Sequence, residues 1–376
     1  MTRTVPEGRI SQVIVKLAER CNLDCPYCYM YHGADQSWRT RPKFMPDAVF
    51  DAMLDRLLAY CERRGGHKVG LSLHGGEPLL VRRERFQSLV ERARERLGDH
   101  LSSIAVQTNG VLLDDAWALH LARLQVSVGI SIDGPAEVHD AARPDLRGRP
   151  THARVVEAIV RLRAAGLDPL GLCVIDPRAD GGEVYDHLRA LGLRKIDLLI
   201  PDVTHETVGR VRGEAATPIA DYLIAAAGRW LAEDDPEVEV RILHGLFRKL
   251  MGGPLVTDAF GNPRLSYLVV DTDGTVQGND VLKICRPALP ETGLNVLEHD
   301  LDLLTAASGP VGAMVHKGVP LCATCRACPD VEVCGGGYLP HRWSDERGFD
   351  NPSAWCGDIR KLLADLRGRC GVALAS

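Results

Sequence analysis

The sequence has no run of apolar residues approaching the roughly 18 that a membrane-spanning helix needs. Its N-terminus, MTRTVPEGRISQ, lacks the apolar core of a secretory signal peptide. It also lacks an excess of positive charge, because the formal net charge is −5, so nothing indicates a nucleic-acid partner. These absences argue against a membrane partner and against secretion, and they indicate a globular protein of the cytoplasm.

The 376 residues do contain many cysteines, 12 in all. In the reducing cytoplasm these are expected to be thiols and not disulfides. Most of them gather in two stretches, and clustered thiols in a reducing compartment indicate metal binding. The length allows two or more domains and a large core.

Short apolar runs alternate with helical patterns over the first two hundred residues. Six runs predict strands, and the helices between them are clearest at 46–64 and 151–165. The predicted strands are 12–17, 69–73, 104–108, 126–132, 171–175 and 196–200. Six β-then-α units with nearly continuous apolar strands predict an α/β fold with a parallel sheet covered by helices. We favour a partial, open (β/α)6 barrel, and an open doubly wound sheet is the alternative. Either fold places ligand residues at the C-terminal ends of the strands.

The composition changes along the chain and predicts four parts. Residues 1–215 would form the barrel domain, and 216–251 a bridge of two helices broken at EDDPE. Residues 252–356 are rich in Gly, Pro and Cys, and their DTDG segment is a hairpin turn signal. We expect a small domain there, held by something other than a large apolar core. A helix and tail, 357–376, would close the chain.

Cys21, Cys25 and Cys28 follow the first predicted strand directly, in the segment ERCNLDCPYCYMYHG. Their C-x3-C-x2-C spacing suits three irons of a [4Fe–4S] cube and leaves the fourth iron open. A zinc site would need a fourth ligand from elsewhere in the chain. Tyr27 precedes the last cysteine. Two other cysteines, Cys61 and Cys173, have no such company and are expected in the core.

This motif, placed after the first strand of a partial barrel, resembles that of the radical S-adenosylmethionine (SAM) superfamily. The resemblance implies that the open iron binds the amino and carboxylate groups of SAM. An electron from the cluster then cleaves SAM and releases a 5′-deoxyadenosyl radical. The resemblance also implies an electron donor of the flavodoxin or ferredoxin type.

The segment LHGGEPLL, which ends the second predicted strand, resembles the GGE motif of the same family. Its glycines would let the backbone approach a ligand closely, and a carboxylate can accept hydrogen bonds from an ammonium. The resemblance assigns that ammonium to SAM. QTNG and SIDGP end the next two strands, and the resemblance places an arginine of HDAARPDLRGR on the SAM carboxylate. Taken alone, GGEP is more often an ordinary turn, and that arginine could be a solvated surface residue. The expected cofactor-binding residues are Tyr27, Gly75, Gly76, Glu77, Asn109, Ser131, Asp133 and Arg143.

A second cysteine-rich stretch, CATCRACPDVEVCGGGYLPHRW, is followed by Cys356. Cys325, Cys328, Cys334 and Cys356 make a closed four-thiolate set, suited to zinc or to an auxiliary [4Fe–4S] cluster. The spacing resembles the SPASM domain of radical SAM peptide maturases, which implies the cluster.

The stretch departs from the SPASM pattern at Tyr338, where that pattern has a further cysteine. The departure leaves the ligand set of a first auxiliary cluster incomplete. Cys285, Cys322 and Cys370 could still form a three-thiolate site, or Cys285 could pack nearby or replace an expected ligand.

The segments DTDGTVQGNDVLKIC, TGLNVLEHDLD, CGGGYLPHRW and FDNPS resemble the maturases that form three-residue cyclophanes. This implies a ribosomally made precursor peptide as substrate and a C–C crosslink between an aromatic ring carbon and a nearby Cβ. Because no leader-binding domain is expected before residue 12, leader recognition would use the core fold or a separate partner. Other SPASM-type reactions, thioether formation or sulfatase-type Ser/Cys oxidation, are alternatives, and a non-catalytic iron–sulfur or zinc protein is a third.

The auxiliary cluster would accept an electron, and a base must take a proton. The unranked candidates for the base are Asp280, His341, His74 and Tyr338.

Overall fold

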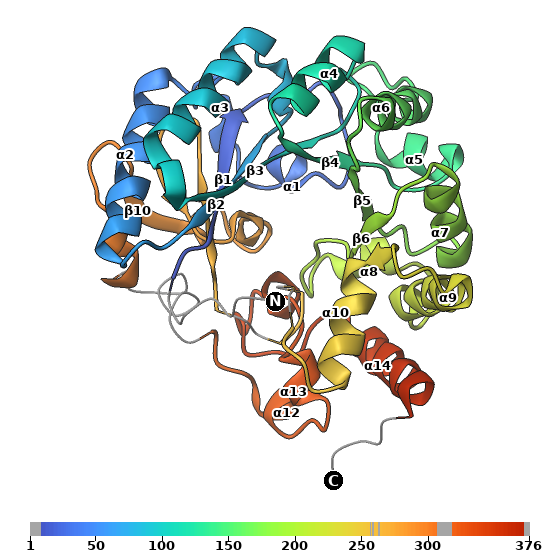
Figure 1. Cartoon of the computed structure of the whole chain (residues 1–376). Helices are drawn as coiled ribbons and strands as arrows, with labels where there is room; N and C mark the ends of the chain where they lie inside the picture. Colours follow the sequence, from blue (N-terminus) through green and yellow to red (C-terminus); the bar gives the residue numbers. More distant parts are fainter. Residues whose placement is uncertain (1–8, 256, 258, 262–263, 307–317, 372–376) are drawn as a thin grey trace. The chain divides into compact units, whose positions relative to one another are not determined.

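The computed structural model describes residues 9–255, 257, 259–261, 264–306 and 318–371 (Figure 1). These residues form two compact units. The first contains the described residues up to Ser131, Arg143–Pro169 and those from Arg264 to Gly318. The second contains Ile132–Ala142, Leu170–Pro263 and the described residues from Val319 onward. The end of the predicted tail, 372–376, lies outside the described residues.

The first unit is built on four parallel strands that follow one another in the chain. They are β1 (Gln12–Ala18), β2 (Val69–Gly75), β3 (Leu101–Thr108) and β4 (Ser127–Ser131). On its other side β1 pairs in parallel with β8 (Tyr267–Val270), which continues antiparallel into β9 (Thr275–Gln277) and β10 (Glu291–Asn295). The order within this unit is therefore β10-β9-β8-β1-β2-β3-β4.

Four helices flank the parallel strands of the first unit (Figure 1). They are α2 (Asp47–Arg63), α3 (Arg83–Leu97), α4 (Asp115–Arg123) and α6 (His152–Ala164). The predicted apolar face of α2 is buried, including Met53, Leu57 and Cys61. Each fully buried side chain of this kind contributes about 1.5–3 kcal/mol relative to an exposed one. The helix begins at Asp47, one residue later than predicted, so Pro46 is its N-cap and not its first residue. The missing N–H of Pro46 costs no helical hydrogen bond at that position.

Short helical elements complete the first unit. They are α1 (Tyr29–His32), η1 (Ser37–Arg39), η2 (Pro78–Leu80), η3 (Gly98–His100), η4 (Asp280–Ile284) and η5 (Leu301–Ala306).

The second unit has three parallel strands, β5 (Leu170–Val174), β6 (Lys195–Leu199) and β7 (Glu239–Val240). Its longer helices include α9 (Pro218–Glu233), which packs against α7 (Gly181–Ala190) and α14 (Cys356–Cys370). The other helical elements are α5 (Ala136–Ala142), α8 (Val208–Arg212), α10 (Arg241–Leu250), α12 (Ala323–Arg326), α13 (Val331–Cys334) and η6 (Leu339–Arg342). Cys173 is buried in β5, as predicted.

The six predicted strands and the parallel α/β fold class are confirmed. The two helices of 216–251 are also present, separated where Asp234 adopts a left-handed conformation. The DTDG hairpin forms, with the Gly274 N–H donating to the Asp271 carbonyl at 2.9 Å. However, its first strand pairs with β1. The compact units therefore cut across the predicted boundaries at 215 and 252. No described helix combines the length and apolar composition that a membrane span requires.

Candidate cofactor and active site

The loop that carries the first three cysteines leaves the end of β1 and closes on itself. The Cys28 N–H donates to the Cys25 carbonyl at 2.9 Å, and Cys28 then caps α1. Burial, the nearby charge of Glu77 and the thiols of Cys25 and Cys28 together raise the pKa of the Cys21 thiol to about 12. Such thiols become ligands only when bound metal displaces their protons. The three side chains are therefore close together in a setting that suits an iron–sulfur group.

The two glycines of the GGE motif lie against the cysteine loop itself. The N–H groups of Gly76 and Glu77 donate to the carbonyls of Ala18 and Arg20 at 2.7 and 2.9 Å. A Cβ on Gly76 would fall 1.9 Å from the Tyr31 hydroxyl and 2.4 Å from the Arg20 carbonyl oxygen. The glycines thus permit a close approach between two protein segments. The close approach to a ligand that the sequence predicts at Gly75 and Gly76 stays a prediction.

Glu77 is fully buried, and its carboxylate accepts three hydrogen bonds from the protein. The donors are the Leu79 N–H at 2.9 Å, the Thr108 hydroxyl at 2.7 Å and the Asn109 N–H at 2.8 Å. Burial raises the pKa of Glu77 to about 7, although these bonds act in the opposite direction. The contact of Glu77 with the SAM amino group stays a prediction. Both carboxylate oxygens already accept hydrogen bonds from the protein.

Asn109, at the C-terminal end of β3, reaches the cysteine loop. Its side-chain Nδ2 donates to Asn22 Oδ1 at 2.8 Å and to Cys21 Sγ at 3.7 Å. Its Oδ1 accepts from the Val111 N–H at 3.0 Å, which fixes the orientation of the amide. The sequence placed this residue near the cofactor but did not indicate a contact with a thiol.

Arg143 and Tyr27 lie together in the first unit, with the guanidinium carbon 5.5 Å from the ring centroid. Arg143 is buried, so it is not the solvated surface arginine of the alternative interpretation. Ser131 is buried at the end of β4. Asp133 belongs to the second unit, where one carboxylate oxygen accepts from the Val174 N–H at 2.9 Å.

Asp280 is the base candidate with the most polar surroundings. It accepts from the Tyr29 hydroxyl at 2.8 Å, and Lys16 Nζ lies 3.0 Å from the same carboxylate. Burial alone would raise the pKa of Asp280, but the Lys16 charge and these hydrogen bonds lower it below the usual value. Asp280 is therefore ionised and in contact with the residue that follows Cys28.

The other three base candidates have different environments. His74 is in the first unit, where burial lowers its pKa and its Nδ1 has no hydrogen-bond partner in the described part of the chain. His341 is in the second unit, where its Nε2 donates to the Pro201 carbonyl at 3.0 Å and burial lowers its pKa to about 3. The ring of Tyr338 packs edge-on against His341.

A group of buried charged side chains lies next to Asp280 and was not predicted from the sequence. Lys16 is fully buried in β1 and also lies 3.0 Å from Asp271. Arg41 joins Asp271 at 3.0 Å and Glu19 at 3.6 Å. A signal was available, because a lysine inside the apolar strand QVIVKL must have a charged partner if both faces of the strand are covered.

The second unit brings the C-terminal cysteines together. Burial and the charges of Cys356 and Cys328 raise the pKa of Cys334 to about 11. Burial and a hydrogen bond with Cys322 raise the pKa of Cys325 to about 12. The four predicted thiols are thus neighbours, and Cys322 is a fifth.

The proposed site of Cys285, Cys322 and Cys370 does not form. Cys356 and Cys370 are the two ends of α14, whose 15 residues extend about 22 Å. Cys322 lies near enough to Cys356 to affect its pKa, which places Cys370 a helix length away. Within the described residues, no three His, Cys, Asp or Glu converge on one metal ion. A cube places each thiolate on a different iron, so this finding leaves the two cysteine groups suited to clusters.

Arg342 tests whether the cysteines of the second unit suit an iron–sulfur cluster. It is fully buried, and its terminal nitrogens donate to the carbonyls of Val319 and Phe349 at 3.3 and 2.9 Å. Its Nε has no partner in the residues that the structure describes. Burial lowers the pKa of Arg342, while the neighbouring thiols, Cys325 first, raise it. An anionic cluster on these cysteines would match both the charge and the unused donor.

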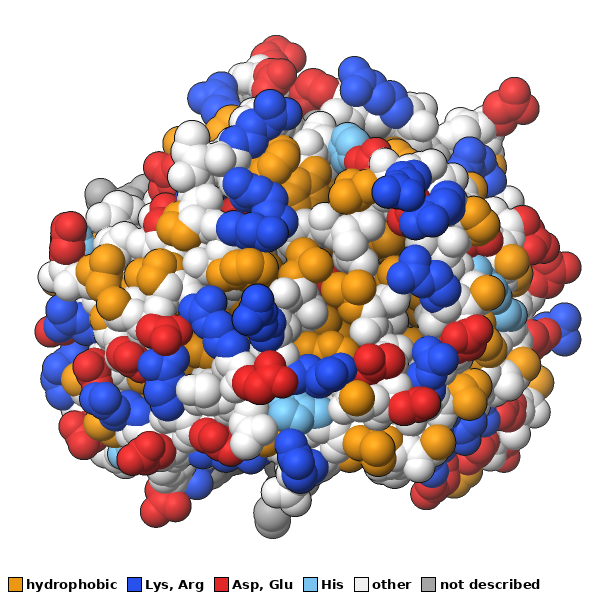
Figure 2. Space-filling model, turned by 90° about the horizontal axis from the view of Figure 1, so that it is seen from above, with side chains coloured by type: hydrophobic (Ala, Val, Ile, Leu, Met, Phe, Trp, Pro, Cys, Tyr) orange, Lys and Arg blue, Asp and Glu red, His pale blue; other side chains and the backbone are white. Residues whose placement is uncertain are grey.

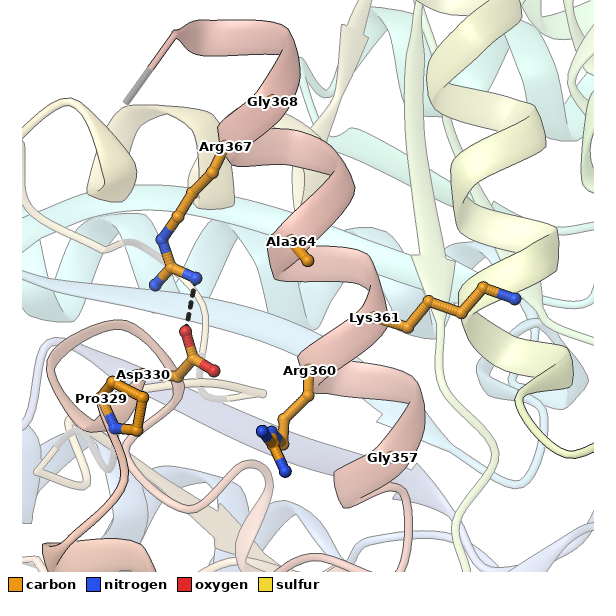
Figure 3. A pocket seen from close by; sticks show the side chains of 8 residues that line it. All are labelled: Pro329, Asp330, Gly357, Arg360, Lys361, Ala364, Arg367 and Gly368. Atoms are coloured by element: carbon orange, nitrogen blue, oxygen red, sulfur yellow. Dashed lines mark ion pairs between the residues drawn. The ribbon is translucent and has the colours of Figure 1, made fainter. Parts of the chain in front are cut away.

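A separate pocket of about 640 Å³ lies between α14 and the residues that follow Cys328 (Figure 3). Arg367 and Asp330 form an ion pair of 2.5 Å on its wall, and Lys361 extends away from it (Figure 3). No thiol or base candidate lines it. On the face in Figure 2, positive and negative side chains are interspersed around apolar ones.

Known proteins resemble this chain, one of them over almost its whole length and another over about half of it. The cysteine-type anaerobic sulfatase-maturating enzyme of Clostridium perfringens is 26% identical over 361 residues, 94% of this chain and 95% of that enzyme. The serine-type enzyme of Klebsiella aerogenes is 32% identical over 177 residues, which are 46% of this chain and 42% of that enzyme.

Two solved structures with bound peptides share the fold. Native anSMEcpe with AdoMet and the Cp18Cys peptide matches with a TM-score of 0.78 and 22% identity, covering 95% of this chain and 97% of that one. Streptococcus suis SuiB with its precursor peptide SuiA matches with a TM-score of 0.61 and 14% identity, covering 93% and 76%. The description "Radical SAM superfamily" matches residues 15–191. Residues 15–191 are therefore similar to the radical SAM superfamily, whose members use a [4Fe–4S] cluster and SAM.

Proposed function

We propose that this chain matures a ribosomally made precursor peptide by closing a cyclophane, with a C–C bond between an aromatic ring carbon and the Cβ of a nearby residue. Action on peptides or proteins is supported by the similarity to sulfatase-maturating enzymes over 94% of the chain and by the peptide-bound relatives of the fold. The crosslink itself is supported by the four segments that resemble cyclophane-forming enzymes.

The hydrogen bond between Asp280 and Tyr29 carries the proposal. The reaction removes a proton from the substrate, which requires an ionised acceptor close to the reacting atoms. Asp280 is ionised because Lys16 lies 3.0 Å away, and the Tyr29 hydroxyl holds the carboxylate beside the loop that binds the cofactor. This geometry favours Asp280 over His341 as the base, because the Nε2–H of His341 already donates to the Pro201 carbonyl.

When bound, SAM and the cluster on Cys21, Cys25 and Cys28 supply a 5′-deoxyadenosyl radical, and an auxiliary cluster supplies an electron acceptor. In this proposal a SPASM-like region holds the auxiliary cluster on Cys325, Cys328, Cys334 and Cys356. Asp280 takes the proton that the aromatic ring loses, and Lys16 balances the charge of the carboxylate. A flavodoxin- or ferredoxin-type protein would be the electron donor, and a cytoplasmic location would keep the thiols reduced.

A second candidate is sulfatase-type oxidation of Ser or Cys, favoured by the 26% identity that extends over almost the whole chain. The two reactions share the radical, the base and a peptide substrate. They differ in the product, because a crosslink contains no aldehyde and formylglycine does.

The test is to incubate the reconstituted enzyme with SAM, a reductant and a peptide encoded beside its gene. A cyclophane lowers the peptide mass by two hydrogens, does not react with a hydrazide probe, and suppresses fragmentation inside the ring. A hydrazide-reactive product would establish the sulfatase-type reaction instead. No 5′-deoxyadenosine at all would leave a non-catalytic iron–sulfur protein.

A further inference from the structure

A continuous chain of hydrogen bonds joins the GGE motif to a cluster cysteine. Glu77 Oε2 accepts from the Asn109 N–H at 2.8 Å, and Asn109 Nδ2 is 3.7 Å from Cys21 Sγ. The second contact of that amide, with Asn22 Oδ1 at 2.8 Å, directs its hydrogens toward the same loop. Three segments distant in sequence are thereby fixed to one another within the first unit.

The surroundings of Glu77 indicate that it acts on the protein and not on a ligand. Its side chain has no exposed surface, and both oxygens are engaged by donors from η2 and from the end of β3. A carboxylate has about four acceptor positions, and protein donors fill three of them in Glu77. Loss of any of these bonds would leave a buried N–H or O–H without a partner, which costs about 1–3 kcal/mol.

Asn109 also has a fixed orientation. Its Oδ1 is occupied by the Val111 N–H at 3.0 Å, so the opposite end of the amide, which carries two N–H groups, must face Asn22 and Cys21. Asn109 itself is buried, and its contacts with Asn22 and Cys21 are partly buried. When Cys21 is a thiolate, the contact becomes a charge-assisted hydrogen bond and shortens.

We propose that Asn109 donates a hydrogen bond to the cluster ligand Cys21, and that Glu77 is a positioning residue that holds Asn109 in place. A donor on a ligand sulfur withdraws negative charge from it and stabilises the reduced cluster, which raises the reduction potential. This inference rests on the radical SAM domain and on no assumption about the peptide product. It also differs from the SAM-binding roles that the resemblance assigns to both residues.

The test compares Asn109→Ala and Asn109→Asp with the wild-type holoenzyme. Electron paramagnetic resonance of the reduced protein is recorded without SAM and then with it, because the signal that SAM alters belongs to the cluster on Cys21. Both variants should change that signal in the absence of SAM and move its midpoint potential to more negative values. Asp should cause the larger shift, because it keeps the shape but puts a negative group beside the sulfur.

Asn295→Ala is the matched control, since Asn295 belongs to the same unit and its side-chain amide also joins backbone segments, donating to the Asp273 carbonyl at 3.0 Å and accepting from the Leu297 N–H at 3.0 Å. Its signal without SAM should match that of the wild type. Glu77→Gln should alter the signal without SAM in the same direction as Asn109→Ala, because the amide cannot accept all three bonds.

Two results would overturn the inference. Cys21 Sγ also accepts from the Leu23 N–H at 3.4 Å, which no variant removes. If Asn109→Asp retains the wild-type signal and potential without SAM, Asn109 does not act on Cys21, whatever happens to Asn109→Ala. If Glu77→Gln weakens SAM binding and leaves the SAM-free signal unchanged, Glu77 contacts SAM directly. Neither result bears on the peptide product, which is measured by mass.

Discussion

His341 shows at the residue scale how burial decides between two roles. An imidazole with a pKa near 3 and its Nε2–H bonded to a carbonyl stays neutral at every physiological pH. Because its pKa in the folded protein lies below the ordinary 6.5, unfolding takes up a proton, and acid favours the unfolded state. The contribution to stability is complete above about pH 6.5 and is lost as the pH falls toward 3.

We therefore predict that lowering the pH to about 5.5 reduces the free energy of unfolding by about 1.4 kcal/mol through His341 alone. Urea unfolding of the holoprotein at about pH 7.5 and about pH 5.5 measures this change. His341→Asn, which keeps a donor for the Pro201 carbonyl, should make the difference between the two pH values smaller by that amount. Identical pH dependence in the variant and the wild type would contradict this role of His341.

Asp280, unlike His341, keeps its charge in the folded protein, and its carboxylate accepts a hydrogen bond from the Tyr29 hydroxyl. Asp280→Asn keeps the size and the contact with Tyr29 but cannot accept a proton. We predict that product formation falls roughly 10²- to 10⁴-fold, as expected for loss of a general base. Cleavage of SAM should continue, because Cys21, Cys25 and Cys28 are untouched.

The measurement is the ratio of crosslinked peptide to 5′-deoxyadenosine, determined on one sample. Tyr338→Phe is the comparison, since it removes the hydroxyl of another base candidate. A ratio that is normal in Asp280→Asn and low in Tyr338→Phe would transfer the role to Tyr338.

At the scale of elements, the sequence predicted what depends on local pattern. The six strands were visible as apolar runs, and α2 as a repeating face. The pairing of β8 with β1 was not, because it joins residues about 255 positions apart and leaves no local signature. Lys16 and Asp271, one on each of these neighbouring segments, were missed for the same reason.

The close fit between the end of β2 and the cysteine loop leaves no room for a side chain at Gly76. Any side chain there must displace the Arg20 carbonyl, whose oxygen would lie 2.4 Å from the added Cβ, and the Tyr31 hydroxyl. We predict that Gly76→Ala moves the loop and lowers the iron bound at Cys21, Cys25 and Cys28.

Iron content and the SAM-sensitive resonance signal measure this effect. Gly368→Ala is the control, since nothing lies within 4 Å of its Cβ position in α14. That change should keep full iron and stabilise the helix by about 0.5–1 kcal/mol. Full iron in Gly76→Ala would show that the loop can yield without cost to the cluster.

At the scale of the whole molecule, each compact unit contains one group of cysteines. Sequence motifs identified both groups, because ligand spacing is local. They did not identify the units, since each is assembled from three separate stretches of chain. The set of Cys285, Cys322 and Cys370 failed for a related reason, because thiols that are plausible partners by count are separated by the length of α14.

The last prediction uses this separation of the two cysteine groups. Cys328 follows Cys325 in a region of short helices, α12 and α13, which bury little apolar surface and therefore depend on metal for stability. Cys328→Ala should lower the iron content by about one cluster, increase protease cleavage near residues 322–356, and abolish crosslinking. SAM cleavage should survive in part, since the first unit keeps its own cysteines. Iron analysis, limited proteolysis and peptide mass spectrometry on one preparation decide the matter. Full crosslinking without that cluster would remove both its electron-acceptor role and its structural one.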